Sequence, residues 1–152
     1  MKTNAIRILE KQNIAYDVHD YDASVTEGEK VAALVGKDAS EVFKTLVTIG
    51  SDGKNYVFVL PVDCTLDLKK AAKAAGIKSV SMLKQKDLFP LTGYVHGGCS
   101  PVGMKKYFPT FLDRSATEKA RICVSAGKVG LQLELTPADL QRAVPYAFAD
   151  LT

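Results

Sequence analysis

The chain has 152 residues, of which 47% are hydrophobic and 24% are charged. This length and composition favour one globular domain over residues 1–152 and exclude a disordered chain. No run of apolar residues approaches the roughly 20 needed to cross a bilayer, and the first residues lack the apolar core of a secretory signal. We therefore expect a cytoplasmic protein without membrane contact.

The charge is unevenly distributed, although the net value is only +3. Residues 1–68 carry 7 basic and 11 acidic side chains, residues 69–106 carry 8 and 1, and residues 107–152 carry 5 of each. A local surplus of this size attracts polyanions such as nucleic acids, but a solvated lysine surface kept for solubility explains the same numbers.

The first third of the chain reads as helix, strand and helix. Thr3 can cap a helix that runs to about Gln12, and the alternation over residues 15–21 predicts a strand. Thr26, followed three residues later by Glu29, matches a capping box and predicts a second helix over residues 27–35.

Two strands are predicted next, over residues 42–49 and 55–60, joined by a turn that contains Asp-Gly. Asp67 then begins a third helix that stops at Gly76. At 100° per residue, three basic side chains fall together on one side of this helix: Lys69, Lys70 and Lys73.

The last third is predicted to hold a short helix near residues 84–89, strands at 122–124 and 131–135, and a terminal helix over 137–143 with proline at its start. Helices and strands alternate without a strict βαβ rhythm. The pattern favours an α+β fold: a single compact domain around a mixed, curved β-sheet with flanking helices.

Lys44 interrupts an apolar strand. Alternate strand residues share a face, so its neighbours on that face are Val42 and Leu46. A lysine in this position either extends its ammonium group to solvent at an edge or points into a cavity where the charge has a purpose. Spacing alone favours the first interpretation.

Two glycine-rich segments, residues 92–103 and 125–130, break the regular pattern. Such segments let backbone groups approach a ligand closely, although ordinary tight loops look the same. Neither matches a phosphate-binding loop or a dinucleotide fingerprint.

The cysteines and histidines of the sequence give little support to a metal site or to a cysteine nucleophile. The three cysteines are odd in number, and no Cys or His spacing typical of a metal site is present, so we expect reduced thiols, no metal and no cofactor. His96 three residues before Cys99 could pair a base with a thiol nucleophile, but coincidence is the commoner explanation.

Five motifs occur in order over nearly the whole chain: Phe43-Lys44-Thr45-Leu46, Leu66-Asp67-Leu68-Lys69-Lys70, Thr92-Gly93-Tyr94, Gly97-Gly98-Cys99-Ser100-Pro101-Val102-Gly103, and Val124-Ser125-Ala126-Gly127-Lys128 followed by Gly130-Leu131. Together they resemble the YbaK/EbsC family of aminoacyl-tRNA deacylases. The resemblance is strongest to the cysteinyl-tRNA(Pro) deacylase branch.

The resemblance implies an α+β domain related to the editing insertion of bacterial prolyl-tRNA synthetases. It implies removal of cysteine misloaded onto proline tRNA, with Lys44 as the residue most tied to activity. The implied substrate-binding residues are Tyr21, Thr45, Gly97, Gly98, Ser100, Pro101, Gly103, Ser125, Gly127 and Gly130.

The mechanism suggested for this branch is attack by the substrate's own thiol, which releases a thiolactone. Aminoacylated tRNA is the expected partner, and prolyl-tRNA synthetase is a second candidate. Removal of another amino acid such as alanine, or non-catalytic binding of charged tRNA or the synthetase, are the alternatives. The lysines that could hold the acceptor-stem phosphates are Lys69, Lys70, Lys73, Lys105 and Lys106.

Overall fold

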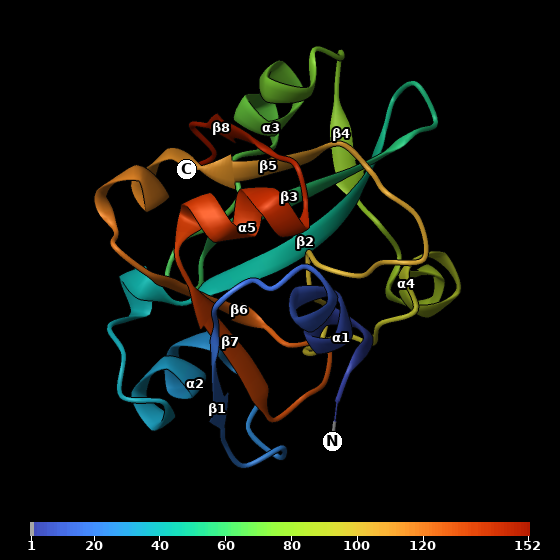
Figure 1. Cartoon of the computed structure of the whole chain (residues 1–152). Helices are drawn as coiled ribbons and strands as arrows, with labels where there is room; N and C mark the ends of the chain where they lie inside the picture. Colours follow the sequence, from blue (N-terminus) through green and yellow to red (C-terminus); the bar gives the residue numbers. More distant parts are fainter. Residues whose placement is uncertain (1) are drawn as a thin grey trace.

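Two β-sheets frame the part of the chain that the computed structural model describes, residues 2–152 (Figure 1). The strands are β1 (Asp17–Asp20), β2 (Phe43–Gly50), β3 (Asn55–Pro61), β4 (Val80–Met82), β5 (Thr110–Asp113), β6 (Ile122–Ser125), β7 (Leu131–Leu135) and β8 (Ala147–Ala149). The helices are α1 (Asn4–Lys11), α2 (Gly28–Leu34), α3 (Leu68–Ala75), α4 (Gln85–Thr92) and α5 (Pro137–Ala143), with short 3-10 helices η1 (Ala39–Glu41) and η2 (Arg114–Glu118).

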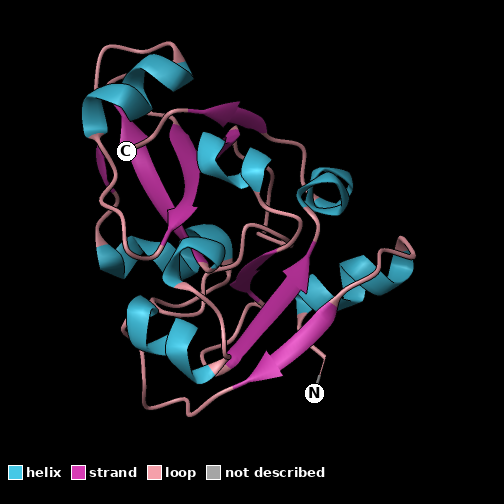
Figure 2. Cartoon of the chain, turned by 90° about the vertical axis from the view of Figure 1, so that its left-hand side faces the viewer, coloured by secondary structure: helices cyan, strands magenta, loops and turns pink. Residues whose placement is uncertain are grey.

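The larger sheet has the strand order β4-β2-β3-β5-β8 and is mixed, because β5 runs parallel to both of its neighbours whereas β2 is antiparallel to β3 and β4. The smaller sheet, β1-β7-β6, is antiparallel. The sheets occupy separate halves of the molecule (Figures 1 and 2) and meet at an isolated bridge between Val42 and Cys123.

The predicted fold class is confirmed, and the expected sheet proves to be divided in two. Asp67 caps α3 and Gly76 ends it in the left-handed conformation, as expected. The prediction of a capping box at Thr26 was wrong, because Glu27 is the N-cap of α2 and its side chain makes no capping hydrogen bond. The actual capping box, Asp38 with Glu41, begins η1. The elements not predicted are η1, η2, β4, β5 and β8.

Buried apolar side chains fill the space between the sheets and the helices that cover them. The main cluster joins α1, the inner faces of β2 and β3, and the β6–β7 pair, with fully buried Leu9, Phe43, Val57 and Leu133 as examples. A second cluster packs beneath α3 and includes Phe58, which stacks on Phe111. No helix within residues 2–152 has the length and apolar character needed to span a membrane.

One edge of β2 has a gap in its pairing. β4 pairs only with Thr48–Gly50, and the bridge to β6 lies at Val42. The Val47 carbonyl accepts a hydrogen bond from the Leu83 amide at this edge. Alternate residues direct their backbone groups to the same edge, so the N–H and C=O of Thr45 point into the gap, where no strand of residues 2–152 pairs with them.

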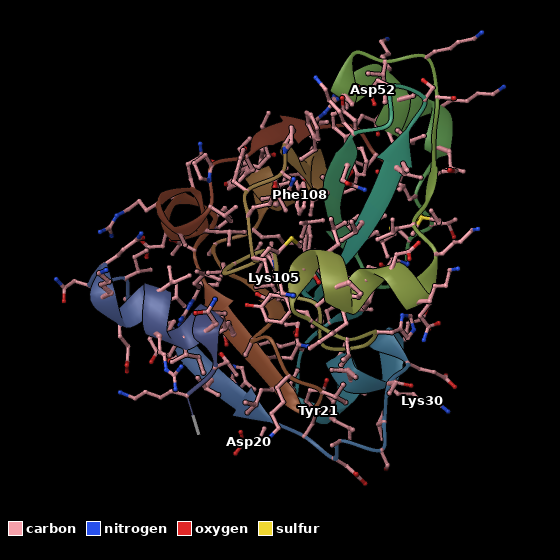
Figure 3. All side chains as sticks on the ribbon, turned by 90° about the vertical axis from the view of Figure 1, so that its right-hand side faces the viewer. Asp20, Tyr21, Lys30, Asp52, Lys105 and Phe108 are labelled. Carbon is pink, nitrogen blue, oxygen red and sulfur yellow. The ribbon has the colours of Figure 1, made fainter. Side chains whose placement is uncertain are left out.

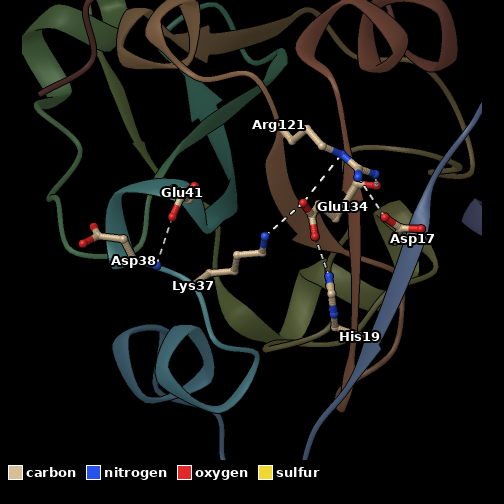
Figure 4. A network of polar contacts seen from close by, with 7 residues as sticks. All are labelled: Asp17, His19, Lys37, Asp38, Glu41, Arg121 and Glu134. Atoms are coloured by element: carbon tan, nitrogen blue, oxygen red, sulfur yellow. Dashed lines mark hydrogen bonds and ion pairs between the residues drawn. The ribbon is translucent and has the colours of Figure 1, made fainter.

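A charged network ties α2 and the following turn to the smaller sheet (Figure 4). The buried Glu134 carboxylate lies 2.6 Å from His19 Nε2 and 3.0 Å from Lys37 Nζ. Arg121 lies 3.6 Å from the same carboxylate and 2.8 Å from Asp17. Lys37 follows α2 in the chain, so the network holds that helix against β7.

The network contributes fully to stability only while Glu134 is ionised. Burial opposes ionisation of Glu134, but the hydrogen bonds from His19 and Lys37 and the charges of Lys37 and Arg121 outweigh it and hold the pKa of Glu134 below its ordinary 4.5. A depressed folded-state pKa contributes stability that is complete above the unfolded value and is lost as the pH falls through the folded one.

We predict that Glu134→Gln lowers the free energy of unfolding by about 2 kcal/mol at pH 7, because it removes an acceptor of charged hydrogen bonds. The difference from the unmodified chain should shrink as the pH falls below about 4. Urea unfolding at several pH values measures it, with exposed Glu118→Gln as the control. An effect that does not depend on pH would contradict the electrostatic account.

Candidate functional site

A cavity of about 240 Å³ opens at the gap in β2. This is smaller than the roughly 300–1,000 Å³ of pockets for drug-sized ligands, so it suits a small chemical group. Its walls come from α2 and the segment before it, β2, β6, β7, α4 and the first glycine-rich segment. The lining residues are Tyr21, Thr26, Gly28, Val31, Val42, Phe43, Lys44, Thr45, Leu46, Val62, Leu88, His96, Gly97, Cys99, Ser125 and Gln132.

Lys44 lines this cavity beside Val42 and Leu46 and is partly buried. Within residues 2–152, no carboxylate oxygen lies within 4.0 Å of its ammonium nitrogen, and no aspartate or glutamate lines the cavity. Lys44 thus lies at a cavity, which the second of the two interpretations requires, and the use of its charge on a ligand stays a prediction.

Tyr94 holds the two glycine-rich segments together. Its buried hydroxyl donates a 2.6 Å hydrogen bond to the Val102 carbonyl. Its ring lies against Gly127, where a Cβ would come within 2.8 Å of the ring, and Gly127 has a φ of +96° that favours glycine. Burial raises the pKa of Tyr94 to about 12, so the hydroxyl remains a protonated donor at neutral pH.

Gly98 allows the two segments to touch backbone to backbone. A Cβ at this position would lie 2.9 Å from the Val129 nitrogen and 3.1 Å from the Lys128 carbonyl carbon. A side chain here would push the segments apart, and with them the wall of the cavity.

The structure brings five of the predicted substrate and catalytic residues into the cavity wall: Tyr21, Lys44, Thr45, Gly97 and Ser125. The other predicted substrate-binding residues are not among those that line it. Close packing explains four of them, Gly98, Gly103, Gly127 and Gly130, where an added Cβ would meet neighbouring atoms. Ser100 Oγ accepts a hydrogen bond from the Val102 amide. Pro101 lines a separate depression.

Two buried polar atoms in the cavity wall have no hydrogen-bond partner within the described chain, Thr45 Oγ1 and Gln132 Oε1. Gln132 lies on β7, opposite Ser125 of β6. The sequence analysis did not select it, although a polar residue between Leu131 and Leu133 in a core strand was a signal.

Cys99 and His96 both line the cavity. Burial raises the pKa of the Cys99 thiol to about 12, with a partly opposing hydrogen bond from Thr92, so almost none of it is thiolate at neutral pH. A thiol in that state is a poor nucleophile, which argues against a cysteine hydrolase.

The predicted RNA-binding lysines lie on helix α3 and in the loop between α4 and β5, at different places around the larger sheet (Figure 1). On α3, Lys69 and Lys73 are exposed, whereas Lys70 is paired with Asp150 at 3.0 Å. Lys105 donates to the Pro90 carbonyl of α4, whose Leu88 lines the cavity. Lys106 is exposed and lies 5.3 Å from the Phe108 ring. Figure 3 shows Lys105 beside α4 on the face that also carries Tyr21.

One cluster has metal-ligating side chains. The ligand atoms of His19, Cys123 and Glu134 lie within 4.8 Å of one another. Lys37 and Arg121 already neutralise the Glu134 carboxylate, and burial raises the pKa of the Cys123 thiol to about 12. This donor set is poorly suited to a cation.

Comparison with known proteins identifies the family. A model described as an aminoacyl-tRNA editing domain matches residues 22–143. The chain belongs to this family. The resemblance seen in the sequence is confirmed.

Individual relatives agree with this assignment. EbsC of Enterococcus faecalis, named as a candidate Cys-tRNA(Pro)/Cys-tRNA(Cys) deacylase, is 45% identical over 153 aligned residues, covering 99% of this chain and 93% of that protein. A proline–tRNA ligase of Shouchella clausii is 28% identical over 102 residues, covering 67% of this chain and 18% of the ligase. A crystal structure described as a candidate trans-editing enzyme for prolyl-tRNA synthetase has a TM-score of 0.88 at 26% identity and covers 100% of this chain and 98% of its own.

We predict that, in the folded protein at pH 7.5, iodoacetamide alkylates half-buried Cys64 faster than Cys99 and Cys123, because a thiol with a pKa of about 12 is only about 3 × 10⁻⁵ thiolate at that pH. Peptide mass spectrometry over time measures the three rates, and the urea-unfolded chain is the control. Rapid alkylation of folded Cys99 would show an activated thiol and contradict this description.

Proposed function

We propose that the chain is a trans-editing aminoacyl-tRNA deacylase that removes cysteine from mischarged Cys-tRNA(Pro). In this proposal it also removes cysteine from Cys-tRNA(Cys). Membership of the editing-domain family and the 45% identity to EbsC support this activity. The observation that carries it in the structure is the cavity itself, which lies at the unpaired edge of β2 and is lined by Lys44, a lysine without a carboxylate partner among the described residues.

Each part of the cavity has a task in ester cleavage. The ester carbonyl oxygen becomes negative when a nucleophile adds to the carbonyl carbon, and donors that are already in place stabilise that charge. Lys44 supplies an ammonium group, and the Thr45 N–H points into the same gap. Gly97, also in the cavity wall, adds no side-chain bulk.

The nucleophile in this proposal is the substrate's own thiol. Its sulfur bonds to the ester carbonyl carbon while the bond from that carbon to the ribose oxygen breaks, and the thiol proton goes to the departing ribose oxygen. The products are cysteine thiolactone and uncharged tRNA, so no water is consumed. Intramolecular attack reaches effective molarities of about 10⁵ M or more, so a site without a nucleophile of its own is sufficient.

The tRNA would be held mainly through its backbone phosphates. Lys105 and Lys106 follow the first glycine-rich segment, and exposed Lys69 and Lys73 add a second positive surface. In this proposal, residues 1–152 act as one editing domain in the cytoplasm, with charged tRNA as substrate and prolyl-tRNA synthetase as a partner.

Two alternatives make different predictions. A deacylase for alanine would release an amino acid that has no thiol, and it would therefore need water as the nucleophile. A non-catalytic module would bind charged tRNA without accelerating its deacylation. The uncompensated charge of Lys44 in a small cavity favours catalysis over binding alone.

We predict that Lys44→Ala slows the release of cysteine from Cys-tRNA(Pro) by at least about 100-fold, because the charge opposite the developing oxyanion is lost. Single-turnover deacylation measures the rate, and Lys54→Ala, in the exposed β2–β3 turn, is the matched control. Circular dichroism should show both variants folded. A folded Lys44→Ala variant with full activity would contradict the proposal.

The product distinguishes the two chemical routes. Rapid quenching followed by mass spectrometry should detect cysteine thiolactone, 18 mass units below free cysteine, before it hydrolyses. Free cysteine with no thiolactone at the earliest times would instead indicate direct hydrolysis. Equal activity on Ala-tRNA would also point to water as the nucleophile.

A further inference from the structure

Gln132 lines the cavity and has a buried carbonyl oxygen that the fold does not use. The side chain belongs to a residue that is 6% exposed, and Oε1 has no partner within residues 2–152. A buried acceptor without a hydrogen bond is destabilising, and few such atoms occur in folded proteins. Its position in the cavity wall means that a ligand could supply the missing donor.

A second acceptor lies in the same wall. Thr45 Oγ1 is also buried and without a partner within the described chain. Elsewhere in β2 the equivalent group is satisfied, since the Thr48 hydroxyl donates to the Tyr56 carbonyl at 2.8 Å. Of the three buried side-chain atoms without a partner in the described chain, Thr45 Oγ1, Ser115 Oγ and Gln132 Oε1, the first and last belong to residues that line the cavity.

The kind of group that fits these atoms follows from their chemistry. An amide oxygen only accepts hydrogen bonds, so its ligand must be a donor. No carboxylate lines the cavity, and Lys44 already places a positive charge there. A ligand amine beside that lysine would therefore be held by neutral oxygens.

We propose that Gln132 Oε1, with Thr45 Oγ1, receives the α-amino group of the aminoacyl ester. This inference rests on the proposed deacylase function and adds a positioning residue to it. On this assignment the amine is held at β7 and β2 while the ester carbonyl lies toward Lys44. Gln132 thus fixes the orientation of the bound amino acid. Esters of acids that lack an α-amino group are poorer substrates.

The test pairs one substitution with one change in the substrate. The substrates are tRNA(Pro) carrying cysteine and the same tRNA carrying 3-mercaptopropionate, which is cysteine without its α-amino group. The proteins are the unmodified chain, Gln132→Met, Gln132→Glu and, as a control, Gln85→Met at an exposed position of α4. Each kcat/KM is divided by the spontaneous deacylation rate of that substrate.

We expect the unmodified chain to prefer the cysteinyl substrate by about tenfold or more. Gln132→Met should lose about tenfold on that substrate and almost nothing on the deamino one, so that the preference disappears. Gln132→Glu, which keeps acceptor oxygens, should retain the preference, and Gln85→Met should behave like the unmodified chain.

Thermal unfolding separates positioning from a structural role. Methionine replaces an unsatisfied polar group with an apolar one of similar size, so Gln132→Met should be as stable as the unmodified chain or more stable. Parallel losses on both substrates, or a preference that survives in a folded Gln132→Met variant, would overturn the inference alone. If the unmodified chain deacylates neither substrate, the proposed function fails and the inference fails with it.

Discussion

The candidate site depends on one constraint in the larger sheet, which is that β2 lacks a partner strand along the middle of one edge. The bridge from Val42 to Cys123 closes one end of this gap, and β4 closes the other from Thr48 onward. A strand edge carries strong backbone donors and acceptors that need partners. In this fold α2, α4 and the first glycine-rich segment cover the gap without filling it, so the unpaired edge becomes one wall of a cavity.

The charged side chains of the Glu134 network are paired with one another, whereas the charged side chain in the cavity wall has no such partner within residues 2–152. Beside the cavity, Glu134 is surrounded by His19, Lys37 and Arg121, and each charge has a partner (Figure 4). Inside the cavity, Lys44 has no carboxylate within 4.0 Å among the residues that the structure describes. The paired network stabilises the fold and holds α2 in place, whereas the charge of Lys44 has no such partner in the described part of the chain, which is the basis of the role we propose for it.

Local sequence patterns predicted most of the elements that lie near the site. Asp67 and Gly76 marked the ends of α3 because capping depends on a few adjacent residues. The short strands β4, β5 and β8 were missed because three or four residues carry too little periodicity, and their pairing partners are distant in the sequence. The division into two sheets was missed for the same reason.

The site could be predicted only in part. Lys44 stood out because a charge interrupts an apolar strand, and the motif resemblance pointed to the glycine-rich segments. Neither could show that Gly98 packs against the second glycine-rich segment or that Gln132 lines the cavity, since both facts depend on contacts between distant segments. Family resemblance identifies which residues matter more readily than it identifies what each one touches.

In the proposed complex, the aminoacyl group enters this cavity with its carbonyl oxygen facing Lys44. A crystal structure with a stable analogue, adenosine that carries cysteine through a 3′-amide, would test it most directly. We expect the cysteinyl group inside the cavity and its carbonyl oxygen within hydrogen-bond distance of Lys44 Nζ or the Thr45 N–H. Density for the cysteinyl group outside the cavity, with Lys44 in contact only with solvent, would contradict it.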